Sequence, residues 1–186
     1  MNVQQNLAIQ SQAQAQVVPN GWYSIFHVAS SLALDVSGED DDAAMVFIYT
    51  GQVNQLWLVQ NHGGGAWSIQ NANGRFLSLR TDRGVPAPML GSAVLCSEMQ
   101  HPWMLIPDPT SPGTFRFWVP NTMLVADPPD ASAATVAGLY PYDPTMIQTW
   151  RLATPAENVA NPGTTTSRRA HRRSDPSITP AAYDEV

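Results

Sequence analysis

The segment VNQLW, residues 53–57, sets a polar Asn–Gln pair between apolar residues and ends in Trp. Two later segments echo it, MQHPW at 99–103 and MIQTW at 146–150. The Trp residues that end these segments lie 46 and 47 residues apart. Because a fixed period of this size is the signature of an internal repeat, the sequence predicts three related units.

Each unit is predicted to contain four short strands. The units open at Gly21, Gly65 and Gly113 with the pattern Gly-X-aromatic-X-apolar. Such alternation after a glycine predicts a half-buried strand. The remaining strands are predicted at 32–36, 77–81 and 124–128, then at 46–50, 93–97 and 139–143, and finally around the three Trp residues.

The fold class follows from these patterns. The repeats show no sustained 3.6-residue apolar period, and Gly and Pro recur between the alternating runs, so we predict an all-β protein. None of the three units can bury its apolar face alone. Closure around a pseudo-threefold axis solves this, which predicts a β-trefoil of twelve strands. A β-propeller needs more blades, and a sandwich does not explain the threefold period.

Composition predicts one folded domain with two tails. The chain has 186 residues, of which 44% are hydrophobic, enough for one substantial core. Segments with little apolar surface cannot offset the entropy of ordering, so both ends are predicted to be disordered. The predicted parts are a Gln/Ala-rich tail at 1–16, a β-trefoil at 17–154 with repeats at about 21–60, 65–107 and 113–154, and a second tail at 155–186.

Charge and cysteine content narrow the class of protein. The net charge of −6 argues against nucleic-acid binding, which normally uses a basic face. The single cysteine, Cys96, excludes an internal disulfide framework and is predicted to be a buried thiol in a strand. The sequence shows no signal-peptide pattern, no stretch of transmembrane length and no Asn-X-Ser/Thr sequon. We therefore predict a cytoplasmic protein without membrane insertion.

These motifs resemble those of a known family. The Gly-X-aromatic-X-Ile openings, the LALDV strand at 32–36 and the Q-X-W endings are similar to ricin B-type lectins, particularly the fungal single-domain forms. The resemblance covers residues 21–152. It implies a β-trefoil that binds carbohydrate. It also implies that the Gln and Trp side chains of these endings pack and hydrogen-bond inside the fold, namely Gln55, Trp57, Trp103, Gln148 and Trp150.

The resemblance also implies a sugar site. In this family a carboxylate accepts bonds from sugar hydroxyls, an aromatic ring stacks on the pyranose, and an amide both donates and accepts. The first repeat supplies Asp35, Tyr49 and Asn54 for these roles, with Gln55 beside them. Phe47 completes the expected site and stands where the family often has a polar contact. The first repeat is therefore the principal predicted site.

Strand alternation supports this assignment. Along residues 46–49, side chains should alternate between the core and the surface. We therefore expect Val46 and Ile48 in the core, with Phe47 and Tyr49 on the surface.

The second repeat is predicted to lack a site. Arg80 aligns with the acid, Leu95 with the ring and Gln100 with the amide, so neither an acid nor a ring is present. His101 replaces the motif glutamine, and a neutral imidazole can still donate and accept a hydrogen bond. No His or Cys at a useful spacing accompanies His101, so we expect no metal site.

The third repeat is predicted to hold a second, poorer sugar site. It retains Asp127 at the acid position and has Tyr142 and Tyr140 as candidate rings. Ile147 stands where the first repeat has its amide.

Two functions of different classes remain open. The sequence shows no matched nucleophile–base set and no cofactor motif, so we expect a non-catalytic protein without cofactor or metal whose partner is a glycan or glycoconjugate. Self-association is left open. The alternative is a β-trefoil protease inhibitor that acts through loops such as 37–45 and 82–92. The joint presence of Asp35, Tyr49 and Asn54 favours the lectin.

Overall fold

The computed structural model describes residues 18–37, 43–79 and 88–160 of the 186-residue chain. The predictions made for residues 1–16, for residues 161–186 and for Arg80 concern parts of the chain outside these described residues. The first repeat contains β1 (Gly21–His27), β2 (Ala33–Val36), β3 (Ala44–Phe47), the short 3-10 helix η1 (Val53–Gln55) and β4 (Trp57–Asn61). The second contains β5 (Trp67–Asn71), β6 (Phe76–Leu79), β7 (Val94–Ser97) and β8 (Met104–Pro107). The third contains β9 (Thr114–Trp118), β10 (Leu124–Asp127), β11 (Thr135–Val136), β12 (Gly138–Pro141) and β13 (Trp150–Ala153), and α2 (Pro155–Ala160) follows.

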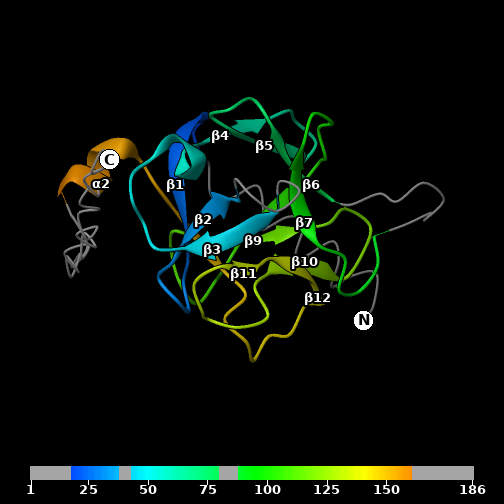
Figure 1. Ribbon diagram of the computed structural model, residues 1–186. Coiled ribbons are helices and arrows are strands. Elements are labelled where there is room, and N and C mark those ends of the chain that lie inside the picture. Colours follow the sequence, from blue (N-terminus) through cyan, green and yellow to red (C-terminus); the bar gives the residue numbers. More distant parts are fainter. Residues whose placement is uncertain (1–17, 38–42, 80–87, 161–186) are drawn as a thin grey trace, which may run out of the picture.

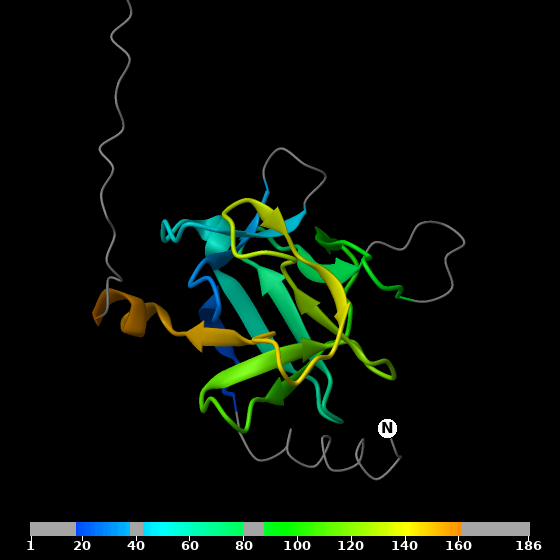
Figure 2. The ribbon, with the colours of Figure 1, turned by 90° about the horizontal axis from the view of Figure 1, so that it is seen from below.

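Six of these strands form a barrel, visible from two directions in Figures 1 and 2. The strands are the first and last of each repeat, paired antiparallel in the order β1, β4, β5, β8, β9 and β13, and β13 returns to β1. The step from β5 to β8 is an antiparallel bridge between Trp67 and Trp103. Every strand of the barrel therefore has two neighbours.

Three hairpins cap the barrel. The second and third strands of the repeats pair as β2–β3, β6–β7 and β10–β12. Bridges from Ala43 to Leu95 and from Ala93 to Gly138 link neighbouring hairpins, and the two-residue strand β11 joins β3. A six-strand barrel with three hairpins is a β-trefoil, so the predicted fold is confirmed. Strand β11 is an addition to the twelve predicted strands.

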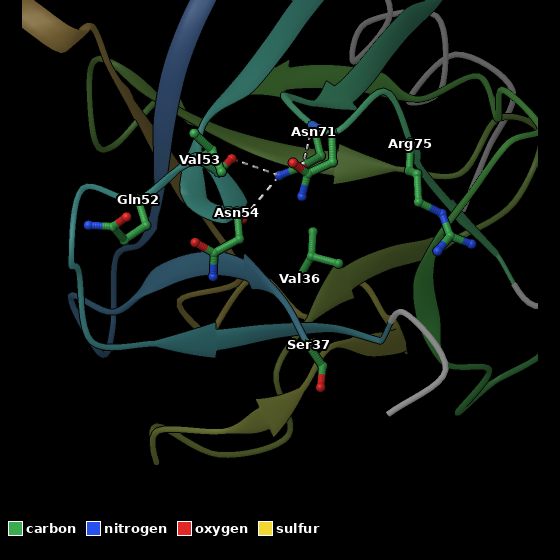
Figure 3. A pocket seen from close by; sticks show the side chains of 8 residues that line it. Val36, Ser37, Gln52, Val53, Asn54, Asn71 and Arg75 are labelled. Atoms are coloured by element: carbon green, nitrogen blue, oxygen red, sulfur yellow. Dashed lines mark hydrogen bonds between the residues drawn. The ribbon is translucent and has the colours of Figure 1, made fainter. Parts of the chain in front are cut away.

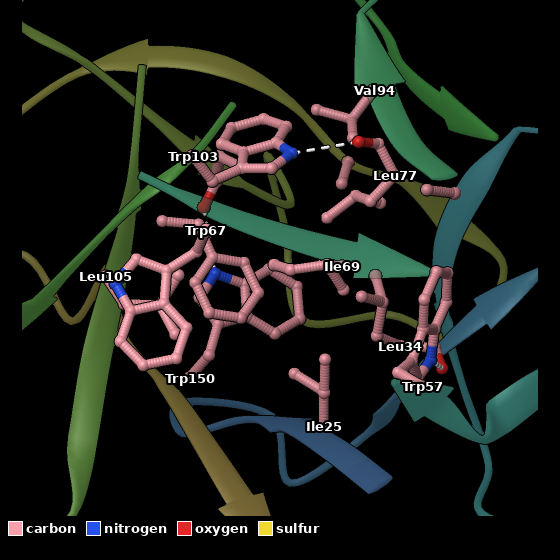
Figure 4. Packing of buried hydrophobic residues seen from close by; sticks show 14 of the residues in the cluster. Ile25, Leu34, Trp57, Trp67, Ile69, Leu77, Val94, Trp103, Leu105 and Trp150 are labelled. Carbon is pink, nitrogen blue, oxygen red and sulfur yellow. Dashed lines mark hydrogen bonds between the residues drawn. The ribbon is translucent and has the colours of Figure 1, made fainter. Parts of the chain in front are cut away.

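The tryptophans of the three repeats make the same internal contact. Trp57, Trp103 and Trp150 are at most 1% exposed, and Figure 4 shows them in the common core. Burying each such ring contributes about 2–3 kcal/mol or more. Each indole Nε1 donates to a backbone carbonyl of the second strand in its own repeat, those of Leu34, Leu77 and Ala126, at 3.0, 2.9 and 2.9 Å. The three repeats predicted from the Trp spacing therefore share the same Trp hydrogen bond.

These contacts correct the alignment of the second repeat. Leu77, whose carbonyl receives the indole bond, corresponds to Leu34, so the next residue, Ser78, corresponds to Asp35. Cross-strand pairing agrees, because Ser78 pairs with Leu95 as Asp35 pairs with Met45. The predicted acid position at Arg80 was wrong by two residues. Leu95 likewise corresponds to Met45 rather than to a ring position.

Two further predictions on local structure can be compared. The Cys96 thiol is buried in β7, as predicted. Ile48, predicted in the core, is 57% exposed, whereas Val46 is fully buried. The reason is that β3 ends at Phe47, so strict alternation does not extend to Ile48.

The start of the predicted C-terminal tail is ordered as a helix. Residues 155–160 form α2, so the boundary of the folded part lies beyond 154. The sequence TPAE at 154–157 explains why the helix begins here. Thr154 precedes the helix and Pro155 is its first residue. The Glu157 carboxylate accepts hydrogen bonds from Thr154 N and Oγ1 at 2.7 and 2.8 Å. This is a capping box, and it could have been recognised in the sequence.

Candidate functional site

A buried hydrogen-bond network joins three of the predicted site residues in the first repeat. Gln55 Nε2 donates to Asp35 Oδ2 at 2.7 Å, and Asn54 Nδ2 donates to Asp35 Oδ1 at 2.5 Å. Gln55 also holds the preceding loop, since its Nε2 donates to Ile48 O and its Oε1 accepts from Thr50 N at 2.7 Å. The motif glutamine therefore ties the loop and η1 to strand β2.

Burial sets the role of the carboxylate. Asp35 is 5% exposed and Gln55 is fully buried. Desolvation raises the pKa of Asp35, and the bonds from Gln55 and Asn54 partly offset this effect. Both residues were predicted as site residues; the structure shows them bonded to each other, with both carboxylate oxygens of Asp35 engaged, and their contact with a ligand stays a prediction. Both side chains are anchors, and they fix the position of the half-buried Asn54.

Asn54 faces a hollow of about 440 Å³ between the first and second repeats, which we call the amide hollow (Figure 3). The walls come from the end of β2, from η1 with the residue before it, and from the turn between β5 and β6. Four of the eight lining residues carry a primary amide. The lining residues are Val36, Ser37, Gln52, Val53, Asn54, Asn71, Asn73 and Arg75.

Asn71 of the second repeat holds η1 in place from the opposite side. Its Nδ2 lies 3.4, 3.0 and 3.4 Å from the carbonyl oxygens of Val53, Asn54 and Leu56, and its Oδ1 accepts from Asn73 N at 2.9 Å. Asn71 is 1% exposed. Sequence reasoning missed this residue, because a contact between repeats leaves no mark in the pattern of one repeat. The only available signal was a buried-strand position occupied by an amide.

Tyr49 does not line the amide hollow. It lies in a neighbouring hollow of about 290 Å³, which we call the tyrosine hollow and which is lined by Ser24, Tyr49, Gly51, Gln52, Val53, Leu56 and Pro155. The Tyr49 ring meets Phe26 edge to face, with ring centroids 5.1 Å apart. Phe47 is 38% exposed and is not among the lining residues of either hollow. The residue paired with Asp35 across the hairpin is Met45.

In the third repeat the predicted residues are engaged elsewhere. Asp127 is buried and lies 3.2 Å from His27 Nε2. Burial raises the pKa of Asp127, and the contact with His27 partly offsets this effect. Tyr142 packs against Trp118, with ring centroids 5.1 Å apart. Tyr140 instead lies close to Gly138, the residue paired with Asp127. The third repeat therefore lacks the acid–amide network of the first.

The second repeat keeps the buried motif tryptophan but lacks the acid of the first repeat. His101 packs edge to face against Trp103, with ring centroids 5.0 Å apart, and burial lowers the pKa of its imidazole. The serine at the acid position, Ser78, carries no charge. No cluster of three or more His, Cys, Asp or Glu suited to a metal occurs in the part of the chain that the structure covers. Within that part, no helix is long and apolar enough to span a bilayer.

The barrel, the capping hairpins and the three Trp contacts define a β-trefoil, and comparison with known proteins identifies its relatives. Residues 7–88 match the family described as ricin-type β-trefoil lectin domain-like. Together with the solved structures described below, this match confirms the predicted resemblance to ricin B-type lectins. Among curated proteins no sequence matches the chain.

Several solved structures share the fold. A ricin B-like lectin from Macrolepiota procera in complex with lactose is 26% identical and has a TM-score of 0.67, with 75% of this chain and 99% of that chain covered. The Rhizoctonia solani agglutinin is 18% identical, with a TM-score of 0.63 and coverage of 74% and 96%. ThreeFoil, a designed threefold-symmetric protein, is 25% identical, with a TM-score of 0.57 and coverage of 73% and 99%.

Proposed function

We propose that this chain is a non-catalytic carbohydrate-binding protein that binds a glycan at the amide hollow of its first repeat. The lectin-like family match includes that repeat. The Macrolepiota procera lectin, which is similar over most of this chain, was solved with lactose. These similarities support the class of ligand, and the residues below carry the proposal for the site.

The observation that carries the proposal is the anchored carboxamide of Asn54. Its bond to Asp35 uses one N–H of the amide, and Asn71 fixes the backbone of the same residue. A second N–H and the oxygen Oδ1 remain, and among the described residues Oδ1 accepts no bond. An amide that can donate and accept at one fixed place suits a sugar hydroxyl, which does both.

The chemistry of the hollow favours binding over hydrolysis. Glycoside hydrolysis generally uses two carboxyl groups on opposite sides of the bond that breaks. The described residues that line the amide hollow include no Asp or Glu, and Asp35 lies behind Asn54 with both oxygens engaged. Neutral bonds exchanged with water give modest affinity for single sugars.

A glycan array followed by calorimetry tests the proposal. Asn54→Ala should weaken binding of the best array ligand by about fivefold to 150-fold, the equivalent of a bond worth about 1–3 kcal/mol. Ile147→Ala is the matched control, because Ile147 occupies the same motif position in the third repeat and is 57% exposed. The control should bind like the wild type.

Two results of these experiments would refute the proposal. Wild-type affinity in Asn54→Ala, or loss of binding in Ile147→Ala alone, would place the site elsewhere. An array without ligands, together with inhibition of papain-like proteases, would establish the protease-inhibitor alternative. Its proposed loops, 37–45 and 82–92, lie partly outside the described residues.

A further inference from the structure

We propose that one residue at each junction between repeats decides whether the preceding repeat can open a sugar site, and that His27 keeps the third repeat closed. This residue pairs with the motif tryptophan from the first strand of the following repeat, and we call it the junction residue. The inference rests on the proposed function, because it concerns a site of the same kind. It goes further by naming the residue that restricts binding to the first repeat.

Strand pairing identifies the junction residues of the first and third repeats. Trp57 of β4 pairs with Asn71 of β5, and Trp150 of β13 pairs with His27 of β1. The two junction residues are 1% and 3% exposed, so both are buried. They therefore occupy equivalent places in the fold with different side chains.

At the first junction the carboxylate is left to the motif. Within the described part of the chain, Asn71 bonds the backbone around η1, with Nδ2 lying 3.0 Å from Asn54 O, and makes no bond to Asp35. Both oxygens of Asp35 accept from motif amides, Oδ1 from Asn54 and Oδ2 from Gln55 at 2.7 Å. The acid therefore fixes the carboxamide that the proposed function places at the sugar.

At the third junction the histidine contacts the carboxylate. His27 Nε2 lies 3.2 Å from Asp127 Oδ1, and neither atom has a further hydrogen-bond partner among the described residues. On the other side of the imidazole, Nδ1 lies 2.9 Å from Ser30 Oγ. The ring also packs against Trp150, with ring centroids 5.3 Å apart. These contacts fix the imidazole beside the acid.

The motif glutamine of the third repeat lacks the bond to its acid. Gln148 donates to Pro141 O at 3.1 Å and accepts from Asp143 N at 2.8 Å, the same pair of loop bonds that Gln55 makes in the first repeat. Gln55 Nε2 also donates to its carboxylate, whereas Gln148 makes no bond to Asp127 among the described residues. Because both glutamines share the loop bonds, the difference lies at the acid, which the junction histidine contacts.

The second junction holds an apolar residue. The pairing of Met104 with Trp118 continues to Trp103 and Val119, so Val119 is the junction residue there. The acid position of the second repeat holds Ser78. This repeat therefore has no carboxylate that a change of junction residue could release.

Two residues separate the third repeat from the arrangement of the first. A bond to a charged acceptor is stronger than one between neutral groups, so a carboxylate orients the amide that donates to it. In the third repeat the carboxylate lies against His27, and Ile147, which is 57% exposed, stands at the place of Asn54. Asparagine at both places would reproduce the first repeat. The fold accepts asparagine at a junction, because Asn71 occupies the first.

A lactose titration followed in ¹H–¹⁵N spectra tests the inference, because backbone amides report each repeat separately. Lactose is the probe because a similar lectin was solved with it. In the wild type the amide of Asn54 should shift and that of Ile147 should not. When His27→Asn and Ile147→Asn are combined, the amide of residue 147 should shift as well. Ile147→Asn alone is the matched control, and its amide at residue 147 should stay unchanged.

Two results of this titration would overturn the inference. A shift at residue 147 in Ile147→Asn alone would show that His27 does not close the third repeat. A folded double variant that shifts only at Asn54 would show that release of the acid opens no site, and the proposed function would stand. The reciprocal change, Asn71→His, does not depend on the folding of the double variant. It should abolish the lactose shift at Asn54, and a wild-type shift there would overturn the inference.

A crystal structure of His27→Asn tests the same idea without any sugar. Gln148 Nε2 should donate to the Asp127 carboxylate, as Gln55 does to Asp35. A Gln148 side chain that keeps only its loop bonds would overturn the inference. Since this result does not depend on lactose, a failure of the proposed function stays distinguishable from a failure of the inference.

Discussion

Replacement of Gln55 by Ala tests whether the motif glutamine of the first repeat holds the candidate sugar site in place as well as stabilising the fold. The matched variant is Gln148→Ala, at the same motif position in the third repeat. The two side chains are 0% and 1% exposed, so the loss of buried volume is nearly the same in both variants. Their difference in stability then reports the difference in hydrogen bonding.

Gln55 makes three hydrogen bonds without a counterpart at Gln148: its Oε1 also accepts from Thr50 Oγ1 at 3.1 Å and Gly51 N at 3.3 Å, and the strongest of the three goes to the Asp35 carboxylate. Gln148 donates to Pro141 O at 3.1 Å and accepts from Asp143 N at 2.8 Å. Gln55 makes the corresponding bonds and also donates to the Asp35 carboxylate at 2.7 Å. A bond to a charged group is worth about 1.5–3 kcal/mol. We expect Gln55→Ala to lower the free energy of unfolding by about that much more than Gln148→Ala does.

Urea unfolding followed by tryptophan fluorescence measures both variants, with the midpoint and the m-value fitted separately. Gln55→Ala should also weaken glycan binding, because Asp35 and Asn54 lose their common anchor, while Gln148→Ala should bind normally. A destabilisation by Gln148→Ala equal to or greater than that by Gln55→Ala would refute the reasoning.

Three further predictions concern other parts of the fold. Trp57→Ala should cost about 3–5 kcal/mol of stability in urea unfolding, because it removes a fully buried ring; near-wild-type melting would contradict the core assignment. Asp127→Ala should destabilise the protein by about 1–3 kcal/mol, because buried His27 then loses the carboxylate beside it. Glycan affinity should stay unchanged. Loss of glycan binding in calorimetry would show that the third repeat holds a sugar site. Burial lowers the pKa of His101, so the unfolded chain binds more protons and stability should fall as the pH falls through about 6.5. His101→Gln should remove that part of the decline in thermal melts at pH 5–8, and an unchanged pH profile would show that His101 is not its source.

Sequence reasoning succeeded where one repeat could be compared with another. The Trp spacing gave the threefold relation, and the fold class followed because twelve short alternating strands need mutual burial. The register of the second repeat was wrong, because the segment LSLRT at 77–81 offers two leucines that can align with Leu34. The indole bond from Trp103 to Leu77 and the pairing of Ser78 with Leu95 distinguish them.

Three of the predicted site residues lie together, and comparison within one repeat was enough to group them. Asp35, Asn54 and Gln55 lie together because strand β2 and the motif are brought into contact within one repeat. Tyr49 lies in the tyrosine hollow and not in the amide hollow, because β3 ends at Phe47 and the Tyr49 ring then packs against Phe26; its contact with a sugar stays a prediction. Asn71 comes from the neighbouring repeat, so its contact depends on barrel closure, which a linear pattern does not contain.

A crystal structure of the protein with the tightest ligand from the glycan array tests the central claim most directly. The account predicts a sugar ring in the amide hollow with a hydroxyl bonded to the Asn54 carboxamide, while Asp35 and Gln55 stay paired behind it. A sugar bound beside Asp127, or bound on the first repeat without contact to Asn54, would contradict it.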